Sequence, residues 1–156
     1  MKLAHFFVLI IFFAFLMVVD AADFKLYPGA KIDEKETKKA NEIAAAAKMV
    51  KTIITIYTTQ DSFDKVFAFH KGIAKEYMIP RESKTNLPKT KSGQTLKDAF
   101  FIFDGSKDIT TSKLWVLVQR PYMGRMKADS PENPKFLDQL YEDIRDVTAI
   151  MVTENK

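Results

Sequence analysis

The stretch from Val50 to Tyr77 constrains the fold more than any other part of the sequence, because its apolar spacing changes once, at Ser62. Before Ser62 the chain is rich in β-branched residues, a composition typical of a strand, here over 50–60. After Ser62 the apolar residues recur at helical spacing and predict one buried face of a helix over 62–77: positions 63, 66, 67, 70, 73, 74 and 77. A strand that leads directly into an amphipathic helix indicates a domain of the α+β class.

Asp61 is the predicted N-cap of that helix. Its carboxylate can accept the backbone N–H of Asp64, and Asp64 places negative charge in the first turn, where the helix dipole favours it. Capping therefore accounts for Asp61 and Ser62. We do not interpret these two residues as triad partners of His70, which lies about two turns further along the helix.

Further strands are predicted in three other segments: 97–103, 113–119 and 144–153. The segments 97–103 and 113–119 are expected to pair as an antiparallel hairpin. A long Ala-rich helix is predicted over 33–49, and a short third helix runs from Asn133 to about Tyr141. The predicted fold is α+β, with an antiparallel sheet of about four strands, two main helices and a short third helix.

The segment 78–97 is a long connector between the predicted helix and the second strand. Connectors of this length are usually lids or mobile loops, and its lysines, prolines and serines favour a mobile loop. Between Arg81 and Lys97 five basic residues face one acid, Glu82. We interpret them as a solvated surface, with an anionic lipid or envelope component as the alternative partner. Nucleic acid is disfavoured, because no aromatic residue interleaves with the basic ones.

The first 21 residues have the three parts of a secretory signal peptide. Lys2 supplies positive charge, Phe6 to Val19 is apolar throughout, and Ala21 is a small residue at the expected cut. The apolar run is shorter than the roughly 20 residues that a membrane-spanning helix needs, so cleavage is favoured over an uncleaved anchor. We therefore expect 1–21 to be a signal peptide and 22–156 to be a single exported domain, periplasmic or secreted.

Patterns that carry known chemistry are missing from the sequence. The chain has no cysteine, which excludes disulfides, thiolate metal sites and cysteine nucleophiles. It also has no Gly-rich phosphate loop, nucleophile elbow, His-Glu-x-x-His pair or calcium loop. We therefore expect no cofactor and no metal, and a function other than catalysis.

Three segments resemble a group of small exported bacterial proteins: Tyr27-Pro28-Gly29-Ala30, Tyr57 to Phe63 and Val66 to His70. The group shares Tyr-Pro-Gly-Ala near the mature N-terminus and a Tyr-x-Thr-x-Asp-Ser junction between a strand and a helix that ends in Phe-Tyr. This chain departs from the pattern at His70, where tyrosine is usual. The resemblance implies an α+β domain outside the cytoplasm and no particular chemistry.

The candidate ligand-binding residues are His70, Trp115, Arg120 and Tyr122. His70 lies on the buried stripe of its helix, so a packed histidine bonded to a carbonyl or hydroxyl is favoured over a base or a metal ligand. Arg120 and Tyr122 follow a strand, with Arg125 nearby, and such groups suit a carboxylate or phosphate.

The sequence is therefore compatible with two functions. The main interpretation is a non-enzymatic exported domain, periplasmic or envelope-associated, with a binding or structural role. The alternative is a small-ligand pocket or weak hydrolase centred on His70.

The predicted strands are apolar on both faces. Within 113–119, residues 114, 116 and 118 are apolar, and so are Trp115 and Leu117 between them. An antiparallel sheet with one solvated face would alternate instead. We therefore expect neither face to be exposed to water. The Ala-rich helix or a second copy of the chain would cover the second face, so a homodimer is an open alternative.

Overall fold

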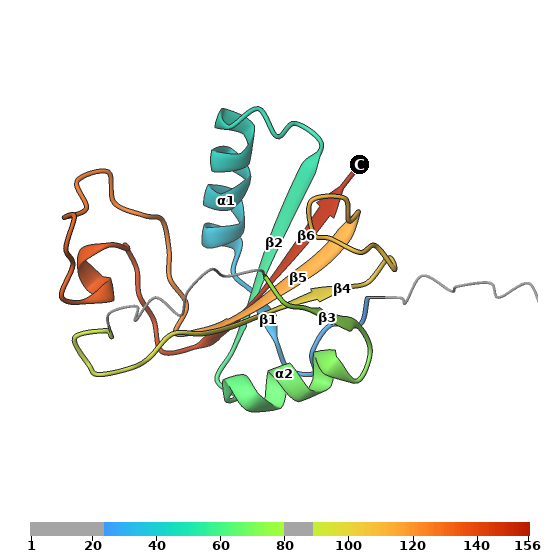
Figure 1. Cartoon of the computed structure of the whole chain (residues 1–156), viewed down its shortest axis with the longest axis horizontal. Helices are drawn as coiled ribbons and strands as arrows, with labels where there is room; N and C mark the ends of the chain where they lie inside the picture. Colours follow the sequence, from blue (N-terminus) through green and yellow to red (C-terminus); the bar gives the residue numbers. More distant parts are fainter. Residues whose placement is uncertain (1–23, 80–88) are drawn as a thin grey trace, which may run out of the picture.

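The computed structural model describes residues 24–79 and 89–156, in which one antiparallel sheet carries an α-helix on each face (Figure 1). The predicted signal peptide, 1–21, and residues 80–88 of the connector lie outside the described residues. Among the described residues, no helix combines the length and the apolar composition needed to span a bilayer.

The elements in chain order are β1 (Lys31–Ile32), α1 (Glu34–Ala46), β2 (Thr52–Thr59), α2 (Phe63–Lys71), β3 (Lys75–Tyr77), β4 (Lys97–Ile102), β5 (Leu114–Arg120), the 3₁₀ turn η1 (Leu137–Gln139) and β6 (Thr148–Asn155). All neighbouring strands pair antiparallel in the order β1-β2-β6-β5-β4-β3. The last strand in the sequence therefore lies in the middle of the sheet, between β2 and β5.

The α+β class and the β4–β5 hairpin are confirmed, but the sheet has six strands rather than about four. The two strands that the sequence did not predict are β1 and β3, at the two edges of the sheet. They contain two and three residues, which is too short for a period-two pattern to be recognised. Short edge strands also leave little unpaired backbone for other chains to pair with.

The N-cap of α2 is Ser62 and not the predicted Asp61. The Ser62 hydroxyl accepts the backbone N–H of Lys65 at 3.4 Å. The Asp61 carboxylate accepts the Tyr27 hydroxyl at 2.9 Å and a side-chain bond from Lys65 at 3.3 Å. Asp61 thus connects the N-terminal segment to the start of the helix, a tertiary contact that the local pattern could not indicate.

Helix α2 also ends earlier than predicted, at Lys71 and not at 77. Gly72 follows as the C-cap, and the chain turns into β3, where Tyr77 pairs with Phe100. The apolar residues at 73, 74 and 77 satisfied helical spacing, yet Ile73 and Ala74 pack on the core from the turn that follows the helix. The period of an apolar pattern alone does not show where a helix stops.

The predicted third helix is reduced to the single turn η1, and β6 begins at Thr148 and not at 144. Most of the segment 121–147 pairs with itself as two arms, with isolated bridges between Tyr122 and Arg145 and between Met126 and Tyr141. These pairs use the backbone groups that a helix would need. The excursion 121–147 is therefore largely irregular, as Figure 1 shows on the left.

Helix α1 begins as predicted, with the Asp33 carboxylate accepting the Glu36 N–H at 3.1 Å, and ends at Ala46, before the predicted end at 49. Its side chains bind the backbone of β2. Asn41 accepts the Ile54 N–H at 3.0 Å and donates to the Ile54 carbonyl at 2.6 Å. Thr37, one turn earlier, accepts the Ile56 N–H at 2.9 Å. These two side chains satisfy a strand edge that β1 is too short to pair.

The main core lies between the sheet and α2. Alternate residues of the three central strands β4, β5 and β6 point into it, together with Val66 of α2; the buried members are Val66, Ala99, Phe101, Phe103, Val116, Val118, Ile150 and Val152. Phe24 packs edge-on against Phe103, with ring centroids 5.5 Å apart, so the N-terminal segment also covers this face. We call it the α2 face.

The opposite face, the α1 face, is covered only in part. A smaller core of Ile56, Tyr122 and Ala149 forms there, with Ala40 of α1 against it. The principal contacts of α1 with the sheet are with β2. Phe100, Trp115 and Leu117, on β4 and β5, remain half-buried on this face. Of the two covers expected for this face, the Ala-rich helix does not cover β4 and β5, because it is bound to the edge of β2; cover by a second copy of the chain stays a prediction.

Candidate binding site on the open face of the sheet

The four candidate residues do not come together. His70 points into the core on the α2 face, and Arg120 is the last residue of β5. Trp115 and Tyr122 both belong to the α1 face, but they line two different cavities. A single pocket that uses all four side chains is thus absent from the part of the chain that the structure describes.

His70 is fully buried, with 0% of its surface exposed. Its Nδ1 lies 2.9 Å from the Val66 carbonyl, and since a carbonyl only accepts, Nδ1 carries the proton. Nε2 has no hydrogen-bond partner among the described residues, and the ring lies beside those of Phe69, Phe101 and Phe103. Burial lowers the pKa of His70 below its usual value, an effect that the bond to Val66 partly offsets.

These contacts agree with the prediction of a packed histidine bonded to a carbonyl. A side chain with no exposed surface cannot reach a substrate without opening the core.

Arg120 is already bound by groups of the protein. Its Nε donates to Asp146 at 2.9 Å, and its NH1 donates to the Asp61 carbonyl at 2.8 Å and to Thr148 at 3.2 Å. Arg125, the second arginine of the predicted anion site, pairs with Glu142 at 3.2 Å. Both guanidinium groups are therefore neutralised within the chain, and an added anion would have to displace these carboxylates.

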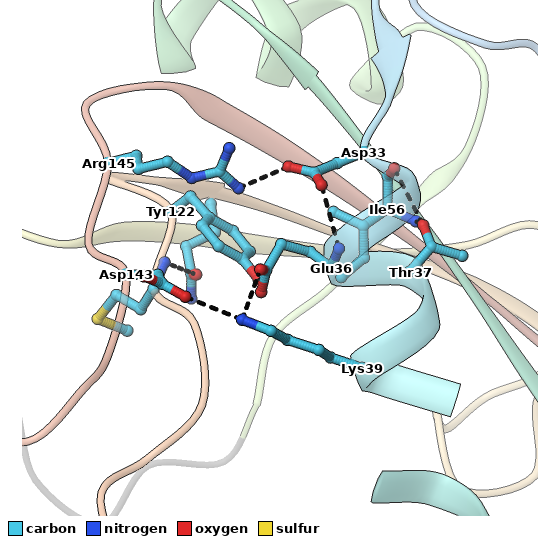
Figure 2. A network of polar contacts seen from close by, with 10 residues as sticks. Asp33, Glu36, Thr37, Lys39, Ile56, Tyr122, Asp143 and Arg145 are labelled. Carbon is cyan, nitrogen blue, oxygen red and sulfur yellow. Dashed lines mark hydrogen bonds and ion pairs between the residues drawn. The ribbon is translucent and has the colours of Figure 1, made fainter. Parts of the chain in front are cut away.

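Tyr122 belongs to a buried polar network beside the start of α1 (Figure 2). Its hydroxyl donates to Glu36 at 2.6 Å, and Lys39 donates to the other Glu36 oxygen at 2.9 Å. The Glu36 residue is 5% exposed, a degree of burial that a carboxylate tolerates only with such partners. Burial and the bond to Glu36 raise the pKa of Tyr122, so it remains a hydrogen-bond donor.

The same network fastens the excursion 121–147 to α1. Lys39 reaches Asp143 at 2.9 Å, and Arg145 binds Asp33 at 2.6 Å while its guanidinium lies 4.6 Å from the centre of the Tyr122 ring (Figure 2). Every charged group drawn there has a partner of opposite charge. Three carboxylates share two cations, and each of them is bonded within the network. We therefore interpret the network as structural.

The surface left open on the α1 face is apolar. Phe100, Leu117 and Met151 lie side by side on β4, β5 and β6 in one row of the sheet. Trp115 lies in the next row, with its ring 6.0 Å from that of Phe100. All four are half-buried. We call these four residues the open face.

A cavity of about 440 Å³ begins at the Trp115 end of the open face. Met49, from the turn after α1, lines one side, and the β4–β5 loop lines another, from Ile109 to Lys113. The floor continues along β6 through Thr153 and Asn155. Asn155 is held in place by bonds to the Ser112 carbonyl at 2.8 Å and from Thr52 at 2.8 Å.

The cavity combines three apolar side chains, Met49, Ile109 and Trp115, with polar and basic ones. Thr110 and Thr111 are exposed and carry hydroxyls at the mouth. Lys113 and Lys156 also line it, and neither forms an ion pair with any described residue. An aromatic ring beside aliphatic groups, with cations at the edge, can bind a ligand that has an apolar body and a negative end.

Sequence reasoning named only Trp115 among the residues that line this cavity. Met49 appeared as the end of the helix predicted over 33–49, and residues 106–112 as a loop or a helical turn between the two strands of the predicted hairpin. The available signal was the apolar character of both faces of 113–119, which required Trp115 to find a cover. Which segment would supply that cover depends on the strand order, and β6 between β2 and β5 was not predicted.

No group of three or more acidic, histidine or cysteine side chains suited to a metal ion occurs among residues 24–79 and 89–156. No protein-family model, no curated protein and no solved structure matches the chain. The evidence on function therefore consists of the sequence and the geometry described above.

Proposed function

We propose that this chain is an exported, non-enzymatic binding domain, and that its ligand is a small amphipathic anion held against Trp115. Export is proposed from the N-terminal sequence pattern. The observation that carries the binding function is the 440 Å³ cavity, which brings Trp115, Met49 and Ile109 together with two lysines without ion-pair partners in the described chain. A periplasmic or secreted site of this kind suits a carboxylate or phosphate with an alkyl or aromatic body.

The geometry favours Trp115 over His70 as the centre of binding. The hydrolase alternative requires His70 to contact a substrate, whereas the side chain is enclosed by aromatic rings and faces away from the open face. Arg120 and Tyr122 are committed to Asp146 and Glu36. Of the four candidate residues, only Trp115 lines a cavity whose lysines form no ion pair with residues 24–79 or 89–156.

Fluorescence provides a direct test, because Trp115 is the only tryptophan in the chain. Decanoate and the neutral decanol are titrated against the protein while tryptophan emission is recorded. A ligand of about 12 heavy atoms at about 0.4 kcal/mol per atom gains roughly 5 kcal/mol, which corresponds to a Kd of about 0.2 mM. We expect decanoate to change the emission in that range and to bind more tightly than decanol.

Matched variants locate the charge that is recognised. Lys113→Gln should weaken decanoate binding by about threefold to tenfold and leave decanol unchanged, because it removes a partly solvated cation. Lys35→Gln, an exposed lysine of α1 that does not line the cavity, should change neither. Equal effects of the two substitutions, or no change of emission with either compound, would refute the proposal.

The half-buried Phe100, Trp115 and Leu117 support a second occupant, another copy of this chain. Twofold pairing is the commonest way in which an apolar surface is covered. Light scattering after gel filtration, combined with Trp115 emission over a range of protein concentrations, separates the two cases. A dimer whose tryptophan emission shifts as it dissociates would show that the open face binds a second copy.

A further inference from the structure

The turn between α1 and β2 exposes more apolar surface than its position requires. It contains Lys48, Met49, Val50 and Lys51, and none of the residues that usually form turns. Val50 is 88% exposed, the highest value among the large hydrophobic side chains of the described residues, and Met49 is 48% exposed. A β-branched apolar residue at the tip of a solvated turn contributes nothing to the fold.

The backbone of this turn ends α1 in an ordinary helix-ending motif. Lys48 has a φ of 60°, in the left-handed region. Its N–H donates to the Ala45 carbonyl at 3.0 Å, and the Met49 N–H donates to the Ala44 carbonyl at 2.9 Å. These bonds fix the direction in which the tip projects, while the Lys48 residue itself is exposed.

Unpaired lysines surround the tip. Strand pairing and two backbone bonds bring the neighbouring segments together: the Lys156 N–H donates to the Lys51 carbonyl at 2.9 Å, and the Asn155 N–H donates to the Lys113 carbonyl at 2.9 Å. The β4–β5 loop reaches the same end, since its residues from Ile109 to Lys113 line one cavity with Met49 (Figure 1). Four lysines near the tip form no ion pair within the described residues: Lys48, Lys51, Lys113 and Lys156.

The acids at this end offset part of that charge. Asp104 accepts the Lys113 N–H at 2.5 Å and the Ser112 hydroxyl at 3.0 Å, and Asp108 accepts the Tyr77 hydroxyl at 2.8 Å. These neutral donors turn the two carboxylates toward the protein and leave their charge in place, while Glu154 is exposed. Lys48 and Lys51 border the apolar tip directly and are exposed, so the charge next to Val50 is positive and faces solvent.

We propose that this end of the molecule docks on an anionic lipid surface, with Val50 and Met49 inserted among the acyl chains and the lysines at the headgroups. Exposed apolar side chains bordered by lysines have the composition of interfacial membrane anchors, since burial of apolar area and attraction to anionic lipid add together. The long lysine stems can lie along the apolar boundary while their ammonium groups stay in the headgroup layer. The partner is a bilayer and not a soluble anion, because an isolated phosphate would gain nothing from Val50.

Docking does not depend on the proposed ligand of the Trp115 cavity. Met49 belongs to both the tip and the cavity wall, so docking would bring the cavity close to the lipid. The two proposals can fail separately, because the decanoate test uses no membrane and the docking test uses no ligand.

The absence of cysteine allows a specific label. Val50→Cys and, as the matched control, Met126→Cys are each labelled with an environment-sensitive fluorophore; Met126 is also largely exposed but lies in the excursion 121–147. The full chain is mixed with vesicles of phosphatidylcholine alone or with 30% phosphatidylglycerol. We expect a blue shift and higher intensity at position 50 only, and only with the anionic vesicles. Because the label reports one position, the result is independent of any membrane affinity of residues 1–21.

Charge variants give the affinity. Lys48→Gln with Lys51→Gln should weaken binding to the anionic vesicles by about 25-fold, since each lysine near such a surface contributes roughly a factor of five. Lys35→Gln with Lys38→Gln, two exposed lysines of α1 away from the tip, should change it by less than about twofold. Both pairs are measured by the loss of the position-50 signal as vesicles are diluted, at low and at moderate salt, and salt should weaken the binding.

Several results would overturn the proposal. One is the same response at positions 50 and 126, and another is equal binding to neutral and anionic vesicles. Full competition by 10 mM glycerol phosphate would show recognition of a soluble anion instead. A blue shift at position 50 that grows with protein concentration in the absence of vesicles would identify the tip as a contact between two copies.

Discussion

The two faces of the sheet carry similar apolar residues, but one face is closed by a helix and the other is left partly open. On the α2 face, side chains of β4, β5 and β6 meet Val66 and the aromatic residues of α2, and the rings of Phe101 and His70 lie 5.5 Å apart. On the α1 face, the helix binds the edge of β2 through Thr37 and Asn41 and leaves Phe100 and Trp115 half-buried. The large apolar face of α2 closes one side of the sheet, while the small alanine face of α1, a helix held at the edge of β2 by polar side chains, leaves β4 and β5 open.

The largest expected effect contrasts two adjacent phenylalanines of β4. Phe101→Ala should lower the free energy of unfolding by about 4 kcal/mol, because the ring is fully buried on the α2 face. Phe100→Ala, on the open face, should cost only about 1 to 2 kcal/mol, since its ring is partly solvated already. Urea unfolding monitored by circular dichroism measures both. Equal losses would mean that the two faces are closed to the same degree.

A second experiment tests how α1 is held. Asn41→Ala removes both bonds to the Ile54 backbone and leaves a strand edge without partners, so we expect a loss of about 2 kcal/mol in the free energy of unfolding. Lys38→Ala, an exposed neighbour on the same helix, is the control and should change it by less than about 0.5 kcal/mol. If the two substitutions have the same effect, the helix is held by its alanine contacts and not by the strand edge.

A third experiment uses His70, the buried histidine of the α2 face. Because burial lowers the pKa of His70 in the folded state below the usual 6.5, the unfolded chain takes up its proton first as the pH falls. The stabilising effect of the neutral side chain is therefore complete above about pH 6.5. It should decline below that value by up to about 1.4 kcal/mol per pH unit.

His70→Phe is the control for this titration. The difference in free energy of unfolding between the native protein and this variant, measured from pH 7 to pH 5, should change with the predicted slope. The other histidine, His5, lies in the predicted signal peptide and is present in both proteins. A difference that is independent of pH would show that His70 is solvated, and the α2 face would then be less tightly closed than described.

The smallest effect is expected at the tryptophan of the open face. Trp115→Phe should change the free energy of unfolding by less than about 1 kcal/mol, because the residue is half-buried and packs against a single ring. The same variant should lose most of its affinity for decanoate, measured by NMR because the fluorophore is gone. A large loss of stability would instead assign Trp115 to the core.

Local signals in the sequence were sufficient for the long elements. The change of period at Ser62 predicted the junction of β2 and α2, and the apolar runs predicted β4, β5 and their hairpin. They were insufficient at element ends. Ser62 and not Asp61 caps α2, because Asp61 has a tertiary partner in Tyr27, and Tyr77 pairs in β3 because Phe100 is available to it.

The candidate site could be anticipated less well than the fold. Trp115 was singled out as a residue that needed a cover, and it is half-buried on the open face, whereas His70, Arg120 and Tyr122 were grouped with it on chemical type alone. The structure separates them, since neighbouring residues of a strand point to opposite faces and the excursion 121–147 turns Tyr122 toward Glu36.

The sequence by itself determined the α+β class, the polarity of each long element and the apolar character of both sheet faces, because periodicity and composition are properties of neighbouring residues. Only the tertiary structure decided the strand order with β6 at the centre, the attachment of α1 to the edge of β2, and the cavity that Met49 and the β4–β5 loop form around Trp115. Those features depend on contacts between residues as far apart as Asn41 and Ile54, or Thr52 and Asn155. Such contacts produce no periodic pattern of apolar residues in the sequence.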